Sequence, residues 1–143
     1  MRDIPFVFFL AAVLCVMTGM SLGIWMGIAQ QFQFAPVHAH LNLVGWATMA
    51  LFAIYYRLTP QAAQGWLPRI HALFAIFGVI LMTGGLAAEF AGRTEFLAVA
   101  IIGSLMTAAS MLIFMFTIIR HGFGAAPSRN GRTARDMAMT PAE

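Results

Sequence analysis

Residues 4–28 read IPFVFFLAAVLCVMTGMSLGIWMGI, and this run contains no charged side chain. A helix rises about 1.5 Å per residue, so about 20 apolar residues are enough to cross about 30 Å of hydrocarbon. Three more stretches satisfy this requirement, at residues 36–56, 66–88 and 96–119. Backbone groups in lipid must form their hydrogen bonds within the segment. We therefore expect an all-α fold, a four-helix transmembrane bundle within residues 1–121.

The composition favours the same class of protein. Hydrophobic residues make up 61% of the chain and charged residues 9%, whereas soluble globular domains carry about 25% charged residues. The 143 residues leave no room for a separate soluble catalytic domain beside four such segments, so any chemistry is expected among the helices. The single cysteine, Cys15, can form no intramolecular disulfide and is expected to be a small apolar side chain.

The arginines predict the orientation of the chain in the membrane. Cytoplasmic flanks of membrane helices are enriched in Lys and Arg. With the N-terminus inside, only Arg93 falls outside, and the cytoplasmic side receives Arg2, Arg57, Arg69, Arg120, Arg129, Arg132 and Arg135. We expect a multi-pass protein of a bacterial-type inner membrane with both termini cytoplasmic. Residues 122–143, almost free of large apolar side chains, are predicted to be a disordered cytoplasmic tail.

The basic residues do not indicate a nucleic-acid partner. The net charge is +3, but the arginines are dispersed at helix ends and in the tail and form no continuous patch.

Ionisable residues inside a membrane are costly and often functional, and this chain has four, namely His38, His40, His71 and Glu89. His38 and His40 occupy the first turns of the second segment, near the outer face. Histidine is a common ligand of metal ions and of haem iron, so this pair is the strongest chemical signal in the sequence. Two histidines that only bond to water or to carbonyls at the interface are the plainer alternative. His71 is expected to be a satisfied or interfacial histidine, with a second metal or a proton relay as the less favoured role.

The spacing of the pair restricts how iron would be held. Positions two apart on an α-helix point about 200° away from each other, so His38 and His40 are expected to face different sites. Two axial ligands must approach one haem from opposite faces, and one helix cannot supply both. His71 is expected near the inner face, on the order of 20 Å away in depth. The second ligand is therefore expected from another copy of the chain, which predicts a homo-oligomer with haem between protomers.

Residues 38–46 read HAHLNLVGW, and the segment continues to Tyr55-Tyr56. This helix resembles a histidine-bearing helix in the catalytic subunit of haem-copper oxidases and the related nitric oxide reductases. In that family a His-x-His pair serves two different haems, one histidine to each. The family's subunit has twelve helices in three groups of four, so this chain resembles one third of it. The resemblance implies haem b and a homotrimer, which we favour over a dimer.

The sequence also departs from that family. The additional histidines of the family's copper site, two of them adjacent, are absent. The resemblance therefore implies haem ligation by His38 and His40, with electron transfer or redox or gas sensing as the activity. If the chain is an enzyme it is expected to be an oxidoreductase, and no catalytic residue is assigned.

Four more residues are candidates for the surroundings of the haem. Asn42 lies four residues after His38, on the same helical face, and is expected to orient it or to bond between helices. Glu89 is expected on the outer side, where its carboxylate would accept the second N–H of a ligating imidazole. Arg93 would pair with haem propionates, or with a neighbouring glutamate. Trp46, on the same helix as the histidines, is the fourth candidate, although a role in helix packing explains this side chain more simply.

Gly19, Gly23 and Gly27 recur every four residues on the first segment, a stripe that lets another helix approach closely, within the protomer or between protomers.

Two other functions fit the sequence. In one, the histidines are frayed out of the helix by Pro36 and chelate copper or another metal ion without haem. In the other, the chain is a non-catalytic assembly partner of a respiratory oxidase.

Overall fold

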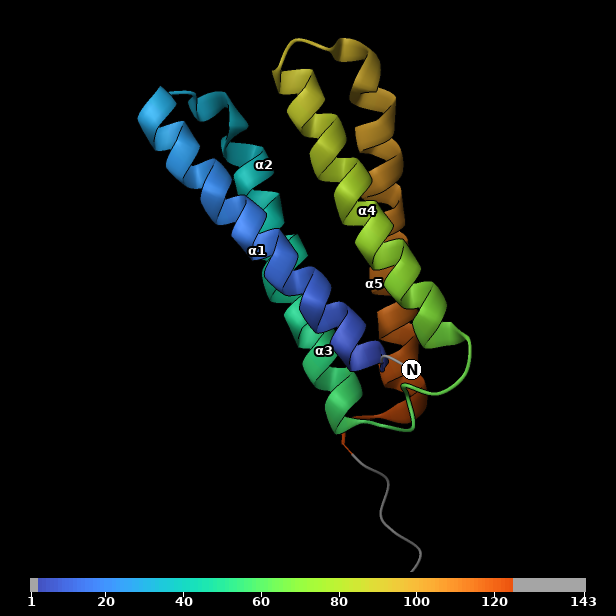
Figure 1. Cartoon of the computed structure of the whole chain (residues 1–143). Helices are drawn as coiled ribbons and strands as arrows, with labels where there is room; N and C mark the ends of the chain where they lie inside the picture. Colours follow the sequence, from blue (N-terminus) through green and yellow to red (C-terminus); the bar gives the residue numbers. More distant parts are fainter. Residues whose placement is uncertain (1–2, 125–143) are drawn as a thin grey trace, which may run out of the picture.

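The computed structural model describes residues 3–124, and within this range the chain is helical and contains no strand. Four helical segments are long and apolar enough to cross a membrane, which confirms the expected number of such helices. The second segment is composite, because its helical geometry changes along its length (Figure 1). In chain order the elements are α1 (Ile4–Ala29), η1 (Phe32–Phe34), α2 (Ala35–His40), the π-helix η2 (Leu41–Thr48), α3 (Met49–Leu58), α4 (Leu67–Phe90), η3 (Thr94–Phe96) and α5 (Leu97–His121).

Prolines and turn residues explain where these helices begin and end. Pro5, Pro36 and Pro68 each lie in the first turn of a helix, where the missing N–H removes no helical hydrogen bond. Gln30 ends α1 in a left-handed conformation with φ of 55°. Each of the four helical segments ends one or two residues later than predicted, whereas α4 and α5 begin one residue later than predicted. The predicted disordered tail falls largely on residues 125–143, outside the described part of the chain.

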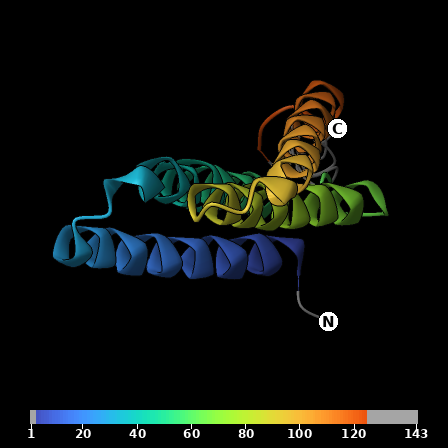
Figure 2. The same ribbon diagram turned by 90° about the horizontal axis from the view of Figure 1, so that it is seen from above.

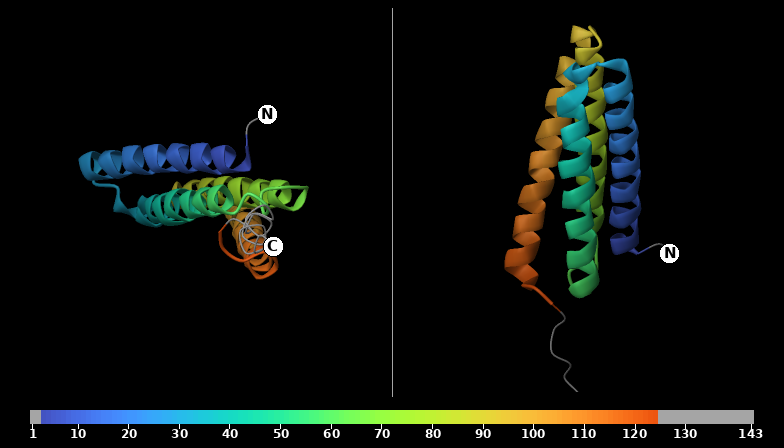
Figure 3. Two further views of the ribbon diagram at one scale, coloured as in Figure 1. Left: turned by 90° about the horizontal axis from the view of Figure 1, so that it is seen from below. Right: turned by 90° about the vertical axis from the view of Figure 1, so that its left-hand side faces the viewer.

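The helices form two antiparallel hairpins. In the first, α1 packs along α2, η2 and α3, and in the second, α4 packs along α5. Seen from either end, α1 and α5 lie on opposite sides of the molecule, with α2–α3 and α4 between them (Figures 2 and 3). The connections α1–α2 and α4–α5 share one end of the bundle, which carries His38 and His40. The start of α1 and the α3–α4 connection lie together at the opposite end of the bundle (Figure 1).

An aromatic cluster joins the two hairpins near the Asp3 end. The His71 ring lies 4.5 Å from the Phe52 ring and 5.0 Å from the Phe8 ring, measured between centroids, and stacks on Phe114 at 5.6 Å. The His71 side chain is fully buried, and its Nδ1 lies 2.9 Å from the hydroxyl of Tyr56. Its Nε2 has no hydrogen-bond partner among residues 3–124. His71 is thus a core residue with one ring nitrogen satisfied.

Glycines allow α4 and α5 to approach each other closely. A Cβ atom at Gly103 would overlap the backbone of Leu81 and Met82 on α4. A Cβ atom at Gly85 would lie 2.5 Å from the backbone nitrogen of Ala100 on α5. Each glycine therefore faces the backbone of the opposite helix, and neither backbone can move without separating the hairpin.

Replacing Gly103 by alanine is expected to destabilise the protein, by about 1–3 kcal/mol, because an added methyl group in a packed interface forces the helices apart. The measurement is the thermal unfolding midpoint in detergent. Gly84→Ala is the matched control, since no atom lies within 4 Å of a Cβ at that position. Equal midpoints for the two variants would show that the α4–α5 contact is looser than described.

Candidate functional site

His38 reaches from α2 to the backbone of α1. Its Nδ1 lies 2.7 Å from the carbonyl oxygen of Gly19, and the side chain is half-buried. A carbonyl oxygen can only accept a hydrogen bond, so Nδ1 must carry the hydrogen. In the neutral ring the lone pair is then on Nε2, the nitrogen that is directed away from this carbonyl.

Two glycines of α1 make room for this side chain and its neighbour. A Cβ atom at Gly23 would lie 2.7 Å from Cε1 of His38, and one at Gly19 would lie 2.8 Å from Nδ2 of Asn42. The close approach predicted from the glycine stripe therefore occurs within the protomer at these two positions. At Gly27 no atom lies within 4 Å of a Cβ.

Asn42 lies beside His38, as the spacing of four predicts. Its Nδ2 donates a hydrogen bond to the carbonyl oxygen of His38 at 2.8 Å. The same nitrogen lies 3.3 Å from Nδ1 and 3.4 Å from Nε2 of the imidazole. A donor in the plane of the ring can approach only one ring nitrogen closely, so nearly equal distances place the amide over the ring face. The Nε2 lone pair of His38 is therefore not consumed by a well-aligned hydrogen bond from Asn42.

His40 has different surroundings. Its Nδ1 lies 2.7 Å from the carbonyl oxygen of Pro36, one turn earlier on the same helix. By the same reasoning Nδ1 carries the hydrogen and Nε2 the lone pair. Because α2 is a regular α-helix over both residues, His38 and His40 diverge by about 200° around its axis. Each imidazole is thus held by a backbone carbonyl and presents Nε2 in its own direction.

A π-helix follows the histidine pair directly. It spans Leu41–Thr48, and the Thr48 hydroxyl donates to the carbonyl oxygen of Leu43, five residues earlier, at 2.9 Å. Gly45 lies within it, and a Cβ there would be 2.7 Å from Cβ of Cys15 on α1. Sequence reasoning did not predict this segment, and Gly45 was its only local signal. π-Helical turns often occur at functional sites, where they alter the direction of the side chains around them.

Within residues 3–124, neither imidazole forms a hydrogen bond with the remaining candidate residues. Trp46 packs against Phe9 of α1, with 6.3 Å between ring centroids, and belongs to the packing between α1 and η2. Glu89 is half-buried in the last turn of α4, and Arg93 is exposed in the α4–α5 connection, both at the end of the bundle that carries the histidines. Within the described chain, the ring Nδ1–H groups bond to the carbonyls of Gly19 and Pro36 and not to Glu89.

Comparisons with protein families, curated proteins and solved structures found no match. Function is therefore inferred from the geometry of the side chains. No group of three or more His, Cys, Asp and Glu residues that could hold a bare metal ion occurs within residues 3–124. A porphyrin supplies four of the ligands of its iron, so a haem requires only one or two from the protein.

The contacts of the two imidazoles predict which ring nitrogen carries the hydrogen in the protein without cofactor. With ring-¹⁵N-histidine, the neutral rings of His38 and His40 are expected to give a protonated Nδ1 signal and an unprotonated Nε2 signal, because each Nδ1 faces a carbonyl. The measurement is ¹⁵N NMR in micelles at alkaline pH, with the signals assigned by their loss in His38→Gln and His40→Gln. Protonation at Nε2 in either ring would contradict the contacts described.

Proposed function

We propose that this chain is an integral membrane protein that binds haem b through His38 and His40. The observation that carries the proposal is the pair of contacts of 2.7 Å between the histidine Nδ1 atoms and the carbonyls of Gly19 and Pro36. Histidines that bind metals commonly donate their other N–H to a carbonyl or carboxylate, which fixes the tautomer and the ring orientation and raises the basicity of the ligand. Both imidazoles have this arrangement.

The two ligands of one iron are proposed to come from neighbouring copies of the chain. His38 and His40 diverge around α2, so they cannot meet on opposite faces of one haem. His71 lies in the aromatic cluster, and His121 ends α5 at the same far end of the bundle. Neither is placed to complete the coordination. His38 of one protomer and His40 of the next are therefore the residues that would hold the haem iron.

The outer surface of the bundle is compatible with an assembly. In the most apolar window of α4, 44% of the residues are buried, against 17% in α1 and 17% in α5. The exposed apolar faces of α1 and α5 can contact lipid or another copy. We favour a homotrimer, because three such chains would supply twelve helices in closed symmetry, as in the haem-copper oxidase subunit that the histidine segment resembles.

The proposed location is a bacterial-type inner membrane, with the termini in the cytoplasm and the haem near the outer face. Among the described arginines, Arg57, Arg69 and Arg120 lie at the end that carries the chain start, and Arg93 lies at the other. This distribution supports that orientation by the enrichment of basic residues on the cytoplasmic side.

A haem held by two histidines would supply reversible one-electron chemistry. Electron transfer or redox sensing is accordingly the proposed activity. The residues of this chain hold and orient the ligands, and Asn42 covers one face of the His38 ring. Arg93, exposed at the same end, is proposed to neutralise haem propionates, and Glu89 lies close to it in the sequence.

The metal-ion alternative receives less support from the geometry. It requires both histidines to leave the helix at Pro36 and converge on one ion. Residues Ala35–His40 are helical, and each imidazole is held in a different direction.

Absorption spectra of the purified protein test the proposal. The reduced protein is expected to show a sharp α-band and a shifted Soret band, as bis-histidine haem does. His38→Ala and His40→Ala are each expected to abolish the α-band, because either change removes one axial ligand. His121→Ala, which removes an imidazole at the far end of α5, is the control and should keep the spectrum. A spectrum without haem in the wild-type protein would favour the assembly-partner function.

A change on α1 tests whether the position of the His38 ring matters. Gly23→Ala adds a methyl group 2.7 Å from Cε1 of His38, so the imidazole must move. Haem affinity is expected to fall about tenfold or more, as it does when the orientation of a metal ligand is disturbed. Gly27→Ala, one turn farther along, meets no atom within 4 Å and should bind haem as the wild type does. Equal haem affinities in the two variants would show that His38 is not a ligand of the haem.

A further inference from the structure

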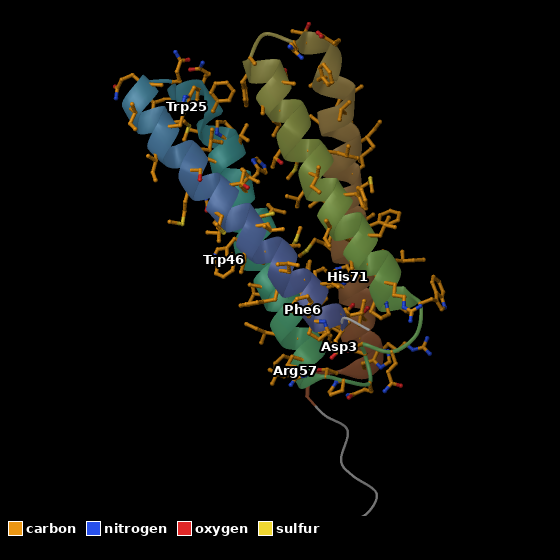
Figure 4. All side chains as sticks on the ribbon, in the orientation of Figure 1. Asp3, Phe6, Trp25, Trp46, Arg57 and His71 are labelled. Carbon is orange, nitrogen blue, oxygen red and sulfur yellow. The ribbon has the colours of Figure 1, made fainter. Side chains whose placement is uncertain are left out.

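Two adjoining cavities lie at the end of the bundle opposite to the histidine pair. The larger, of about 700 Å³, lies between the start of α1, the end of α3 and the α3–α4 connection. The smaller, of about 360 Å³, runs between α1 and α3. Asp3, Pro5 and Arg57 line both, so the two cavities are neighbours that share part of their walls. Figure 4 shows Asp3, Phe6 and Arg57 gathered at this end, with Trp25 at the other.

The larger cavity is electropositive. Arg57 and Arg69 line it, and among the described residues Asp3 is the only acidic one in its wall. Neither guanidinium forms an ion pair with another residue of the described chain. Arg69 lies in the first turn of α4, and α1 also begins here, so two helix N-termini add partial positive charge. The cavity therefore favours an anionic group.

The smaller cavity is apolar and follows the helices toward the middle of the bundle. Its walls include Phe6 and Phe9 on α1 and Ala53, Ile54 and Leu58 on α3. Phe9 and Ile54 are 48% and 49% exposed, so their apolar surface is available for contact from outside the chain. A groove of this kind suits a hydrocarbon chain that lies along the helices.

We propose that these two neighbouring cavities bind one phospholipid with an anionic headgroup, whose phosphate lies between Arg57 and Arg69 and whose acyl chain lies in the groove between α1 and α3. A phospholipid matches this arrangement of a basic cavity beside an apolar groove. Its charged headgroup and its hydrocarbon chain are adjacent and occupy successive depths of the membrane. A quinone fits less well, because its neutral ring leaves two arginines without a partner. The inference rests on the proposed membrane location and is independent of the haem.

Native mass spectrometry of the detergent-purified full chain tests the site, with phosphatidylglycerol and phosphatidylcholine of identical acyl chains as probes. The wild-type protein is expected to retain one phosphatidylglycerol per chain, about tenfold or more in preference to phosphatidylcholine, since each arginine near a lipid surface adds to anionic selectivity. The double variant Arg57→Gln/Arg69→Gln should lose this preference. Arg120→Gln removes a charge at the same end of the bundle, outside both cavities, and should keep it.

A second pair of variants tests the acyl-chain groove. Ile54→Trp fills the groove and is expected to weaken retention of both lipids, because both carry the same chains. Leu51→Trp, on the same helix and 63% exposed, lies outside the groove and should have no such effect.

Three results would overturn the proposal. These are equal retention of the two lipids by the wild type, equal losses in Arg57→Gln/Arg69→Gln and Arg120→Gln, and displacement of the bound lipid by a quinone. The reduced haem spectrum is expected to be the same in all these variants. Loss of lipid selectivity with an intact spectrum thus separates this site from the haem proposal.

Discussion

The hydrogen bond between His38 and the carbonyl of Gly19 is the constraint on which the candidate site depends. It fixes which ring nitrogen carries the hydrogen, and it joins α2 to α1 at the end of the bundle where the rest of the hairpin offers few polar contacts. It forms only because positions 19 and 23 lack a Cβ, so that the His38 ring and the Asn42 amide can lie directly against the α1 backbone. A single feature of α1, its glycine spacing, therefore determines the direction of a side chain on another helix.

The two ends of the bundle differ in what holds them together. Near Asp3, the rings of Phe8, Phe52, His71 and Phe114 connect both hairpins in one buried cluster. Toward the histidine pair the ribbons of the two hairpins diverge in Figure 1, although α2 and η1 still contact α4. The π-helix lies between these two regions. Aromatic rings thus connect the hairpins at one end, and the packing of α2 and η1 against α4 connects them near the histidine pair.

Much of this architecture could be predicted from the sequence. The four spans follow from apolar length, and the position of Asn42 beside His38 follows from helical spacing. The partners of the imidazole N–H groups could not be predicted, because the carbonyl of Gly19 comes near His38 only through the packing of α1 on α2. Sequence reasoning chose Glu89 for that place, since a carboxylate is visible in a sequence and a backbone carbonyl is not. The π-helix was missed for a related reason, because the close approach of Gly45 to Cys15 of α1 is visible only in the folded chain.

The central claim is that one iron is held by His38 of one copy and His40 of the next. Co-assembly of differently tagged His38→Ala and His40→Ala chains tests it most directly. Each variant alone should lack the bis-histidine α-band, whereas random mixed assemblies should regain it at about a quarter of their interfaces, where an intact His38 meets an intact His40. A mixed sample with no recovery, or one variant that retains full haem by itself, would contradict the claim.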